Sequence, residues 1–211
     1  MITLHHLNDS RSQRVLWLLE ELELDYELVQ YQRDPVTNLA PPELKKIHPL
    51  GKSPVITDGN LLVAESAVIV EYLARKYGHG KFAPEADIDS QEYLDYLHWM
   101  HFAEGSGMLP LLLKLYVSRL GEAGQPLWQR IDSELHNHFA YMSDALGDRD
   151  WFVANRFGAA DIQLSFVVEA GAMRGPVSDY PNLVGFKERF RTRPAYRRAL
   201  ERGGPYKFAD A

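Results

Sequence analysis

Cysteine is missing altogether from this chain of 211 residues. Its absence excludes structural disulfides, metal sites built on thiolates and any mechanism that uses a thiol of the protein itself. If the protein carries out sulfur or redox chemistry, the sulfur must therefore come from a ligand.

Long apolar runs are also missing. The best candidate, residues 61–73, is interrupted by Glu65 and Glu71, whereas a membrane-spanning helix needs about 20 mostly apolar residues. Residues 1–6 have neither the basic segment nor the long apolar segment of a signal peptide. We therefore expect a soluble, cytoplasmic protein with no membrane partner.

An excess of positive charge is lacking too. The formal net charge is −6, so the field of the whole chain does not attract nucleic acid. Basic residues do gather near the C-terminus, where a solvated helix face or interface salt bridges explain them better than nucleic acid does. They are Lys187, Arg189, Arg191, Arg193, Arg197, Arg198 and Arg202.

The first part of the chain begins with a β-α-β pattern. Residues 2–7 and 26–31 suit strands, and between them apolar residues recur at helical spacing, namely Val15, Leu18, Leu19 and Leu22. A strand, a helix and a returning strand of this length predict parallel pairing with a right-handed crossover.

An irregular segment over residues 34–49 separates this unit from a hairpin and a second helix. Residues 55–57 and 60–63, around Asp58-Gly59, predict a hairpin with a type I′ turn. A helix pattern follows over residues 67–77. The sequence thus predicts a sheet of four strands, mixing parallel and antiparallel pairs, with helices packed on it.

The remainder of the chain contains helix patterns only. A long helix over residues 91–119 is expected to bend at Gly105-Ser106-Gly107 or at Pro110. The other helices are expected over residues 125–146, 161–172, 182–191 and 194–202. An α/β part followed by an all-α part indicates two domains, residues 1–78 and 88–211, joined by a linker over residues 79–87.

Ser10 follows the first strand, in the segment Asn8-Asp9-Ser10-Arg11-Ser12. A hydroxyl at this point lies where the amides and the dipole of the following helix favour an anion. Serine in such a place is more often a simple N-cap. The segment alone therefore leaves both roles open.

Ser53-Pro54 and Glu65-Ser66 mark two further junctions. A cis Ser53–Pro54 bond would turn the backbone of Ser53 outward to pair with an extended peptide, but cis bonds are rare and the sequence alone favours trans. Glu65 and Ser66 could be a first-turn acid and an N-cap. Alternatively, their carboxylate, hydroxyl and helix amides complement an α-amino acid head group.

Taken in order, these segments resemble the glutathione site of the cytosolic glutathione transferases. They are Ser-x-x-x-Arg-Val-Leu from Ser10, His-Pro-Leu-Gly-Lys-Ser-Pro-Val-Ile from His48, and Glu-Ser-Ala-Val-Ile from Glu65. The resemblance extends over the whole chain, through FGAADIQL at residues 157–164 and through YPNL and RPAY at residues 180–183 and 193–196. The segment HFAEGS at residues 101–106 is similar to the fungal and bacterial enzymes akin to those of yeast.

The resemblance implies a fold and a set of site residues. The fold is an N-terminal thioredoxin-like domain followed by an all-helical domain, and the protein is expected to be a homodimer with no metal. Ser10 would face the glutathione sulfur, with Ser12 and Asn8 as alternatives. The glutathione-binding residues would be Lys52, Ser53, Pro54, Glu65 and Ser66.

Two positions depart from the family pattern. Most classes have valine where this chain has Ser53, which should change little if only the backbone binds. The serine or threonine of the usual capping box is replaced by Gly158, three residues before Asp161. Since glycine is an acceptable N-cap, Asp161 is still expected to cap the helix, as a structural residue, but less firmly.

The expected reaction is attack by the glutathione thiolate on a small hydrophobic electrophile. A free thiol has a pKa near ~8.5, so a hydrogen bond from Ser10 would help to ionise it. The same thiolate would serve a peroxidase, an isomerase or a dehalogenase, and the sequence cannot separate these. The second substrate is expected near the middle of the long helix, where the candidates are Tyr96, His101, Glu104, Met108 and Tyr116.

The sequence suggests two alternatives to glutathione transferase activity. Domains of the same fold also act as glutathione-binding or assembly modules without turnover, although the intact Ser10, Lys52, Glu65 and Ser66 set argues against a degenerate site. His98, His101 and Glu104 at helical spacing could outline a metal site, but a partly solvated helix face is the commoner explanation.

Overall fold

The structure, a computed structural model, describes residues 1–209. Contacts divide the chain into two compact units. The first comprises residues 1–83 together with 191–207, and the second comprises residues 84–190 with the segment that begins at Phe208.

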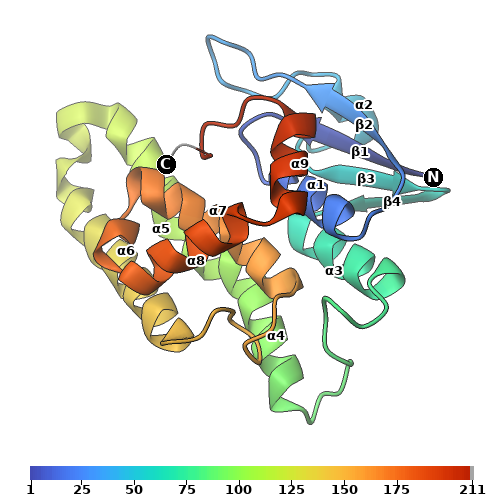
Figure 1. The fold of residues 1–211 in the computed structure, drawn as a ribbon. Helices are drawn as coiled ribbons and strands as arrows, with labels where there is room; N and C mark the ends of the chain where they lie inside the picture. The colour runs from blue at the N-terminus through green and yellow to red at the C-terminus, as the bar shows by residue number, and fades with distance from the viewer. Residues whose placement is uncertain (210–211) are drawn as a thin grey trace. The chain divides into compact units, whose positions relative to one another are not determined.

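A four-stranded mixed sheet forms the centre of the first unit (Figure 1). Its order is β2-β1-β3-β4, with β1 parallel to β2 and antiparallel to β3, and with β3 antiparallel to β4. The strands are β1 (Ile2–Leu7), β2 (Tyr26–Tyr31), β3 (Val55–Asp58) and β4 (Leu61–Ala64). The predicted β-α-β unit and the mixed sheet are confirmed.

Helix α1 (Ser12–Glu21) is the most deeply buried helix of this unit. It packs against β1 and against two other helices, α3 (Ser66–Tyr77) and α9 (Pro194–Gly203). Leu16 and Trp17 of α1 are completely buried, which explains why so short a helix is stable: its stability comes from tertiary packing. Burial of α1 fixes the direction of the loop that precedes it.

Two local expectations for the first unit are wrong. The structure pairs Asp58 with Leu61, so the hairpin turn is Gly59-Asn60 rather than Asp58-Gly59. Only Gly59 has a positive φ, +58°, which is the pattern of a type II′ turn rather than type I′. The segment expected to be irregular also contains a four-residue helix, α2 (Leu44–Ile47), anchored by the fully buried Leu44.

The second unit contains helices joined by loops, with no strand among its described residues. Its main helices are α4 (Gln91–Phe102), α5 (Met108–Val117), α6 (Gln125–Leu146), α7 (Ala159–Arg174) and α8 (Pro181–Arg191). Two 3-10 segments, η2 (Ser118–Gly124) and η3 (Val177–Asp179), complete it. In α7, every residue from Ala159 to Gly171 is buried, and this helix contacts both α4 and α5.

The expected break in the long helix lies at the glycine cluster. A π-helix, η1 (Ala103–Gly107), joins α4 to α5. Pro110 has no amide to bond the carbonyl four residues earlier, which disfavours a regular α-helix there. A Cβ on Gly107 would lie 3.0 Å from a Val167 methyl carbon, so this glycine also allows α7 to approach closely.

The start of α7 shows the expected carboxylate cap. Asp161, which is completely buried, accepts hydrogen bonds from the Gly158 amide (2.9 Å, Oδ2) and from the Phe152 amide (2.9 Å, Oδ1). Gly158 has no side chain to complete the reciprocal bond. Asp161 therefore also ties the loop before α7 to the helix.

Helix α9 groups with the first unit, although it follows the all-helical segment in the sequence. Two of its basic residues, Arg198 and Arg202, bond to Glu20 of α1, and Arg193, just before α9, bonds to Glu21. The domain boundaries expected from the sequence stay a prediction. Among residues 1–209, no helix is both long enough and apolar enough to cross a membrane.

Candidate active site

The loop between β1 and α1, which carries Ser10, is held in place from two sides. Arg33 donates from Nε to the Asn8 carbonyl (3.1 Å) and from Nη2 to the Asp9 carbonyl (3.2 Å). The Lys207 amide donates to Asp9 Oδ1 at 2.8 Å. These contacts hold Asp9 at φ 49°, a conformation that Asp tolerates better than most residues. The loop conformation is thus fixed by the protein itself.

The Ser10 hydroxyl lies at the end of this loop, with 7% of the residue exposed. Its oxygen is 2.8 Å from the Leu7 carbonyl and 2.8 Å from Ser12 Oγ, and it accepts the Ser12 amide at 3.2 Å. Helix α1 begins at Ser12, so Ser10 is not the N-cap expected from the sequence. It nevertheless satisfies one free amide of the first turn, so the structural and functional roles are compatible.

Ser12, the alternative to Ser10, is completely buried. Its hydroxyl oxygen is 2.9 Å from His6 Nδ1 and 3.1 Å from the Leu7 carbonyl, and it accepts the Leu7 amide at 3.3 Å. A hydroxyl enclosed in this way cannot reach a ligand atom. Of the two serines, the geometry favours Ser10.

Asn8, the other alternative, is occupied by its neighbours. Its Oδ1 accepts the Arg33 amide at 2.8 Å, and its Nδ2 donates to Asp9 Oδ2 at 3.2 Å. These bonds explain Asn8 as a loop-stabilising residue.

Ser53 extends the contact between β3 and β1. The last backbone pair of these strands is His5–Val55, and beyond it the Ser53 hydroxyl donates to the His5 carbonyl (2.8 Å) and accepts the Leu7 amide (3.1 Å). The Ser53–Pro54 peptide bond is cis, against the preference of the sequence alone. The expectation that Ser53 acts only through its backbone is therefore incomplete, because its side chain connects two strands.

Glu65 and Ser66 stand at the start of α3. Glu65 is exposed and precedes the helix with φ 72° and ψ 120°, a strained conformation for a residue with a side chain that costs about 1–3 kcal/mol. Ser66 is buried and accepts a hydrogen bond from Arg14 Nη1 at 3.3 Å. The capping role considered for Ser66 is wrong by one position, because Glu65 is the N-cap and Ser66 the first helical residue.

Three of the sequence-predicted residues, Ser10, Ser12 and Ser53, are thus linked through the backbone of Leu7. Leu7 bonds both Ser53 and the Ser10–Ser12 pair, while Arg14 of α1 connects to Ser66. Lys52 is exposed in the loop before Ser53. The Ser10 hydroxyl lies beside the first amides of α1, a combination suited to a ligand with a negative charge.

Comparison with known proteins assigns the family. Family models match for the glutathione S-transferase N-terminal domain over residues 1–75 and for the C-terminal domain over residues 106–194. Glutathione S-transferase 3 of Schizosaccharomyces pombe is 36% identical, with 96% of this chain and 88% of the relative aligned. The chain belongs to the glutathione S-transferase family. It is an enzyme of that class.

Solved structures agree with this assignment. A glutathione S-transferase from Actinobacillus pleuropneumoniae has a TM-score of 0.89 at 35% identity, covering 100% of this chain and 97% of that one. A glutathione transferase homologue from Lodderomyces elongisporus, solved with two GSH per subunit, has a TM-score of 0.79 at 20% identity, with 96% and 99% covered. The thioredoxin-like and all-helical fold of the family is therefore the fold of this chain.

The second-substrate candidates of this glutathione S-transferase differ in accessibility. Tyr96 and Met108 are 1% and 3% exposed, so they are closed to a ligand in this conformation. Glu104 is half-buried, His101 is exposed and Tyr116 is 58% exposed. Accessibility thus favours the last three, and the second-substrate site stays a prediction.

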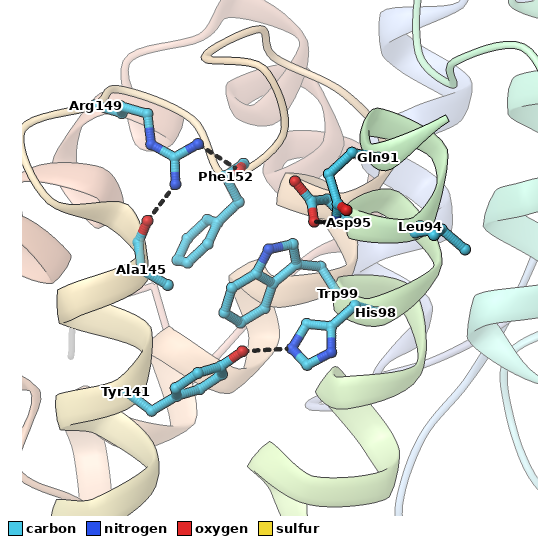
Figure 2. A pocket seen from close by; sticks show the side chains of 9 residues that line it. All are labelled: Gln91, Leu94, Asp95, His98, Trp99, Tyr141, Ala145, Arg149 and Phe152. Atoms are coloured by element: carbon cyan, nitrogen blue, oxygen red, sulfur yellow. Dashed lines mark hydrogen bonds between the residues drawn. The ribbon is translucent and has the colours of Figure 1, made fainter. Parts of the chain in front are cut away.

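A cavity of about 470 Å³ lies between α4 and α6 in the second unit (Figure 2). None of the five second-substrate candidates lines it. Its polar groups bond to one another or to nearby backbone: Tyr141 to His98 Nε2 at 2.9 Å, Gln91 to Asp95 at 2.7 Å, and Arg149 to the Phe152 carbonyl at 3.2 Å. His98, one of the three residues considered as a metal site from the sequence, is therefore the hydrogen-bond partner of Tyr141. Within residues 1–209, no cluster of three potential metal ligands is found.

Sequence reasoning missed three residues that organise the site: His6, Arg14 and Arg33. His6 shares a strand face with Ile2 and Leu4, and this two-residue spacing could have placed it inside. Arg14 belongs to the segment that carries the family resemblance but had no assigned role. No sequence signal identifies Arg33, because its contacts depend on the path of the chain after β2.

Proposed function

We propose that this chain binds glutathione where α1, β3 and α3 begin, and transfers its thiolate to small hydrophobic electrophiles. In this arrangement the Ser10 hydroxyl donates to the sulfur and the Ser53 backbone pairs with the cysteinyl unit. Glu65 and Ser66 hold the γ-glutamyl head group, and Lys52 attracts a carboxylate. The observation that carries the proposal is the Ser10 hydroxyl, held at the entrance to α1 while Ser12 is enclosed beneath it.

The chemistry follows from stabilising the thiolate. A free thiol of pKa ~8.5 is mostly protonated at neutral pH. Lowering that pKa by one unit needs about 1.4 kcal/mol, and a hydrogen bond to a charged group contributes about 1.5–3 kcal/mol. The positive end of the α1 dipole adds to this effect. One hydroxyl and one helix terminus therefore suffice to make the thiolate a substantial species at pH 7.

Two steps complete the reaction. The thiolate attacks the electrophilic carbon of the second substrate, a sulfur–carbon bond forms, and the leaving group departs with the electrons of the broken bond. No covalent intermediate with the enzyme is needed, so the protein contributes activation and positioning. With an organic hydroperoxide as the second substrate, the same thiolate would give a peroxidase.

The test is a glutathione titration, followed by activity assays with an aryl halide, an alkyl halide and an organic hydroperoxide as second substrates. Saturable glutathione binding together with turnover of at least one compound is expected. Binding without turnover of any compound would favour a glutathione-binding module, and no binding would refute the proposed site.

We also include a homodimer and a cytoplasmic location in the proposal. Both follow the family that the sequence resembles. A dimer is supported by exposed large apolar side chains that a second copy could cover: Leu61, Leu62 and Val68 on β4 and α3, and Leu109 and Leu113 on α5. Light scattering is expected to give twice the chain mass of 24.1 kDa. A mass of one chain at micromolar concentration would contradict it.

A further inference from the structure

A chain of hydrogen bonds runs inward from Ser10 to a buried histidine. Ser10 Oγ lies 2.8 Å from Ser12 Oγ, and Ser12 Oγ lies 2.9 Å from His6 Nδ1. The other side of the imidazole bonds to the backbone of Gly203, at the end of α9. His6 is 4% exposed and Ser12 is completely buried, so water does not compete for these groups.

The contacts of His6 fix its tautomer. Burial lowers the pKa of His6 to about 4, so the imidazole is neutral at pH 7. The hydrogen bond to Gly203 acts against burial by raising the pKa of His6. This is the effect of a ring N–H that donates to the Gly203 carbonyl. A Cβ on Gly203 would lie 3.2 Å from Nε2, so Nε2 is the nitrogen on the Gly203 side and Nδ1 is the one that faces Ser12. Nδ1 is then a bare acceptor, and the Ser12 hydroxyl is the donor that satisfies it.

This tautomer limits where the Ser10 proton can go. Because the Ser12 hydroxyl donates its hydrogen bond to His6 Nδ1, it does not donate to the Leu7 carbonyl. The donor to that carbonyl is then the Ser10 hydroxyl, at 2.8 Å. Donation by Ser10 to a ligand would then leave that carbonyl without its hydroxyl partner. If Nδ1 were absent, the Ser12 hydroxyl could donate to the Leu7 carbonyl instead, from 3.1 Å, and Ser10 would be free to donate outward.

We propose that His6 is a positioning residue that controls proton donation by Ser10, by holding the Ser12 hydroxyl proton and so keeping the Ser10 proton partly engaged inside the protein. The inference rests on the proposed function, since it concerns the hydroxyl that faces the glutathione sulfur. Its consequence is that His6 limits how far the thiol is acidified. Such a limit is useful because a thiolate loses nucleophilicity as its pKa falls, and the best attacking thiol has a pKa near the ambient pH.

Two substitutions separate the two nitrogens of His6. His6→Asn places a carbonyl oxygen near the position of Nδ1 and keeps an acceptor for Ser12, but it loses the bond to Gly203. His6→Gln places an amide near Nε2 and keeps a donor for Gly203, but it loses the acceptor for Ser12. The readout is the pKa of bound glutathione, from the ultraviolet absorbance of its thiolate as a function of pH, with thermal unfolding measured in parallel.

We expect His6→Gln to lower the thiol pKa by about half a unit to one unit, the effect of about one neutral hydrogen bond. His6→Asn should keep the thiol pKa near the parent value while losing more thermal stability. In a Ser12→Ala background, His6→Gln should have no further effect on the thiol, since the link between the two residues is gone. A merely structural role of His6 would move stability but not the thiol pKa.

Several results would overturn the proposal. They are a thiol pKa that rises or stays constant in His6→Gln, equal shifts in the Asn and Gln variants, or a shift that persists without Ser12. If His6→Gln does not fold, His6→Met takes its place with the same expected fall in the thiol pKa, because an apolar side chain at position 6 also removes the acceptor of the Ser12 hydroxyl. The parent protein is titrated first. If it shows no thiolate signal with glutathione, the proposed function itself fails, whereas a normal parent signal with unresponsive His6 variants rejects only the role of His6.

Discussion

At the scale of single residues, two serines separated by one position have opposite surroundings. Ser10 and Ser12 touch each other and both are buried, but Ser12 is completely enclosed by His6 and Leu7 whereas 7% of Ser10 stays exposed. The sequence could name both serines but could not choose between them. The choice depends on which face of the first turn of α1 points inward, and that is decided by packing.

Replacing Ser10 with alanine should therefore damage catalysis more than replacing Ser12. Loss of one hydrogen bond to a charged sulfur corresponds to a fall in kcat/KM of about 10- to 100-fold, with a rise in the pKa of bound glutathione. Ser12→Ala should retain most of the activity of the parent. Steady-state kinetics across pH measure both variants. Unchanged rates in Ser10→Ala with abolished rates in Ser12→Ala would transfer the role to Ser12.

Ser53 is a residue whose side chain matters for the fold rather than for the ligand. Ser53→Val, which introduces the residue usual in the family, removes the donor to the His5 carbonyl and an acceptor of the Leu7 amide. The free energy of unfolding should fall by about 1–2 kcal/mol, or a few degrees in Tm. Urea unfolding measures it.

The matched control for this variant is Ser53→Thr, which keeps the hydroxyl and should stay close to the parent. Equal losses in the Val and Thr variants would show that packing, not the hydrogen bonds, is responsible.

At the scale of elements, α9 is attached to α1 by a buried carboxylate. Glu20 accepts hydrogen bonds from Tyr26 (2.6 Å) and Arg198 (2.8 Å), and Arg202 lies 3.2 Å away. Burial opposes ionisation of Glu20, but these partners outweigh it and lower its pKa below 4.5. Two basic residues of α9, Arg198 and Arg202, thus contribute to the packing of α9 on α1.

Glu20→Gln should lower the free energy of unfolding at pH 7 by about 1–2 kcal/mol. This loss is smaller than that expected for a fully buried ion pair, because Arg198 and Arg202 are nearly half exposed. The folded pKa lies below the unfolded value, so the stabilisation is present above pH 4.5 and disappears as pH falls through the folded pKa.

Urea unfolding at pH 7 and at pH 3–4 should therefore show the parent and Glu20→Gln converging in acid. Glu201→Gln, on the exposed side of α9, is the control and should match the parent at both values. A difference between parent and Glu20→Gln that does not shrink in acid would contradict the ionic role of Glu20.

Element boundaries were largely readable from the sequence, and the exceptions have physical causes. Residues 125–146 show strong helical periodicity and form α6 with the same limits. The hairpin turn was misplaced by one residue because Asp58 hydrogen-bonds Tyr72, Lys76 and Tyr77 of α3, a tertiary interaction that keeps it in the strand. Helix α2 has four residues, too few to show a helical periodicity in the sequence.

At the scale of the whole molecule, chain order and structural units differ at one helix. Residues 191–207 belong to the first unit, although residues 84–190 of the second unit precede them in the chain. They bring Gly203 to His6 and Lys207 to Asp9, so the end of the chain supports the loop that carries Ser10. Local sequence patterns contain no information on these contacts, which is why the sequence did not predict that residues near 203–207 support the loop.

The most direct measurement of the central claim is a crystal structure of the protein soaked with glutathione. We predict the sulfur within hydrogen-bond distance of Ser10 Oγ, the cysteinyl backbone paired with Ser53, and the γ-glutamyl group at Glu65 and Ser66. Glutathione bound elsewhere with its sulfur far from Ser10, or no bound glutathione at millimolar concentration, would contradict the account.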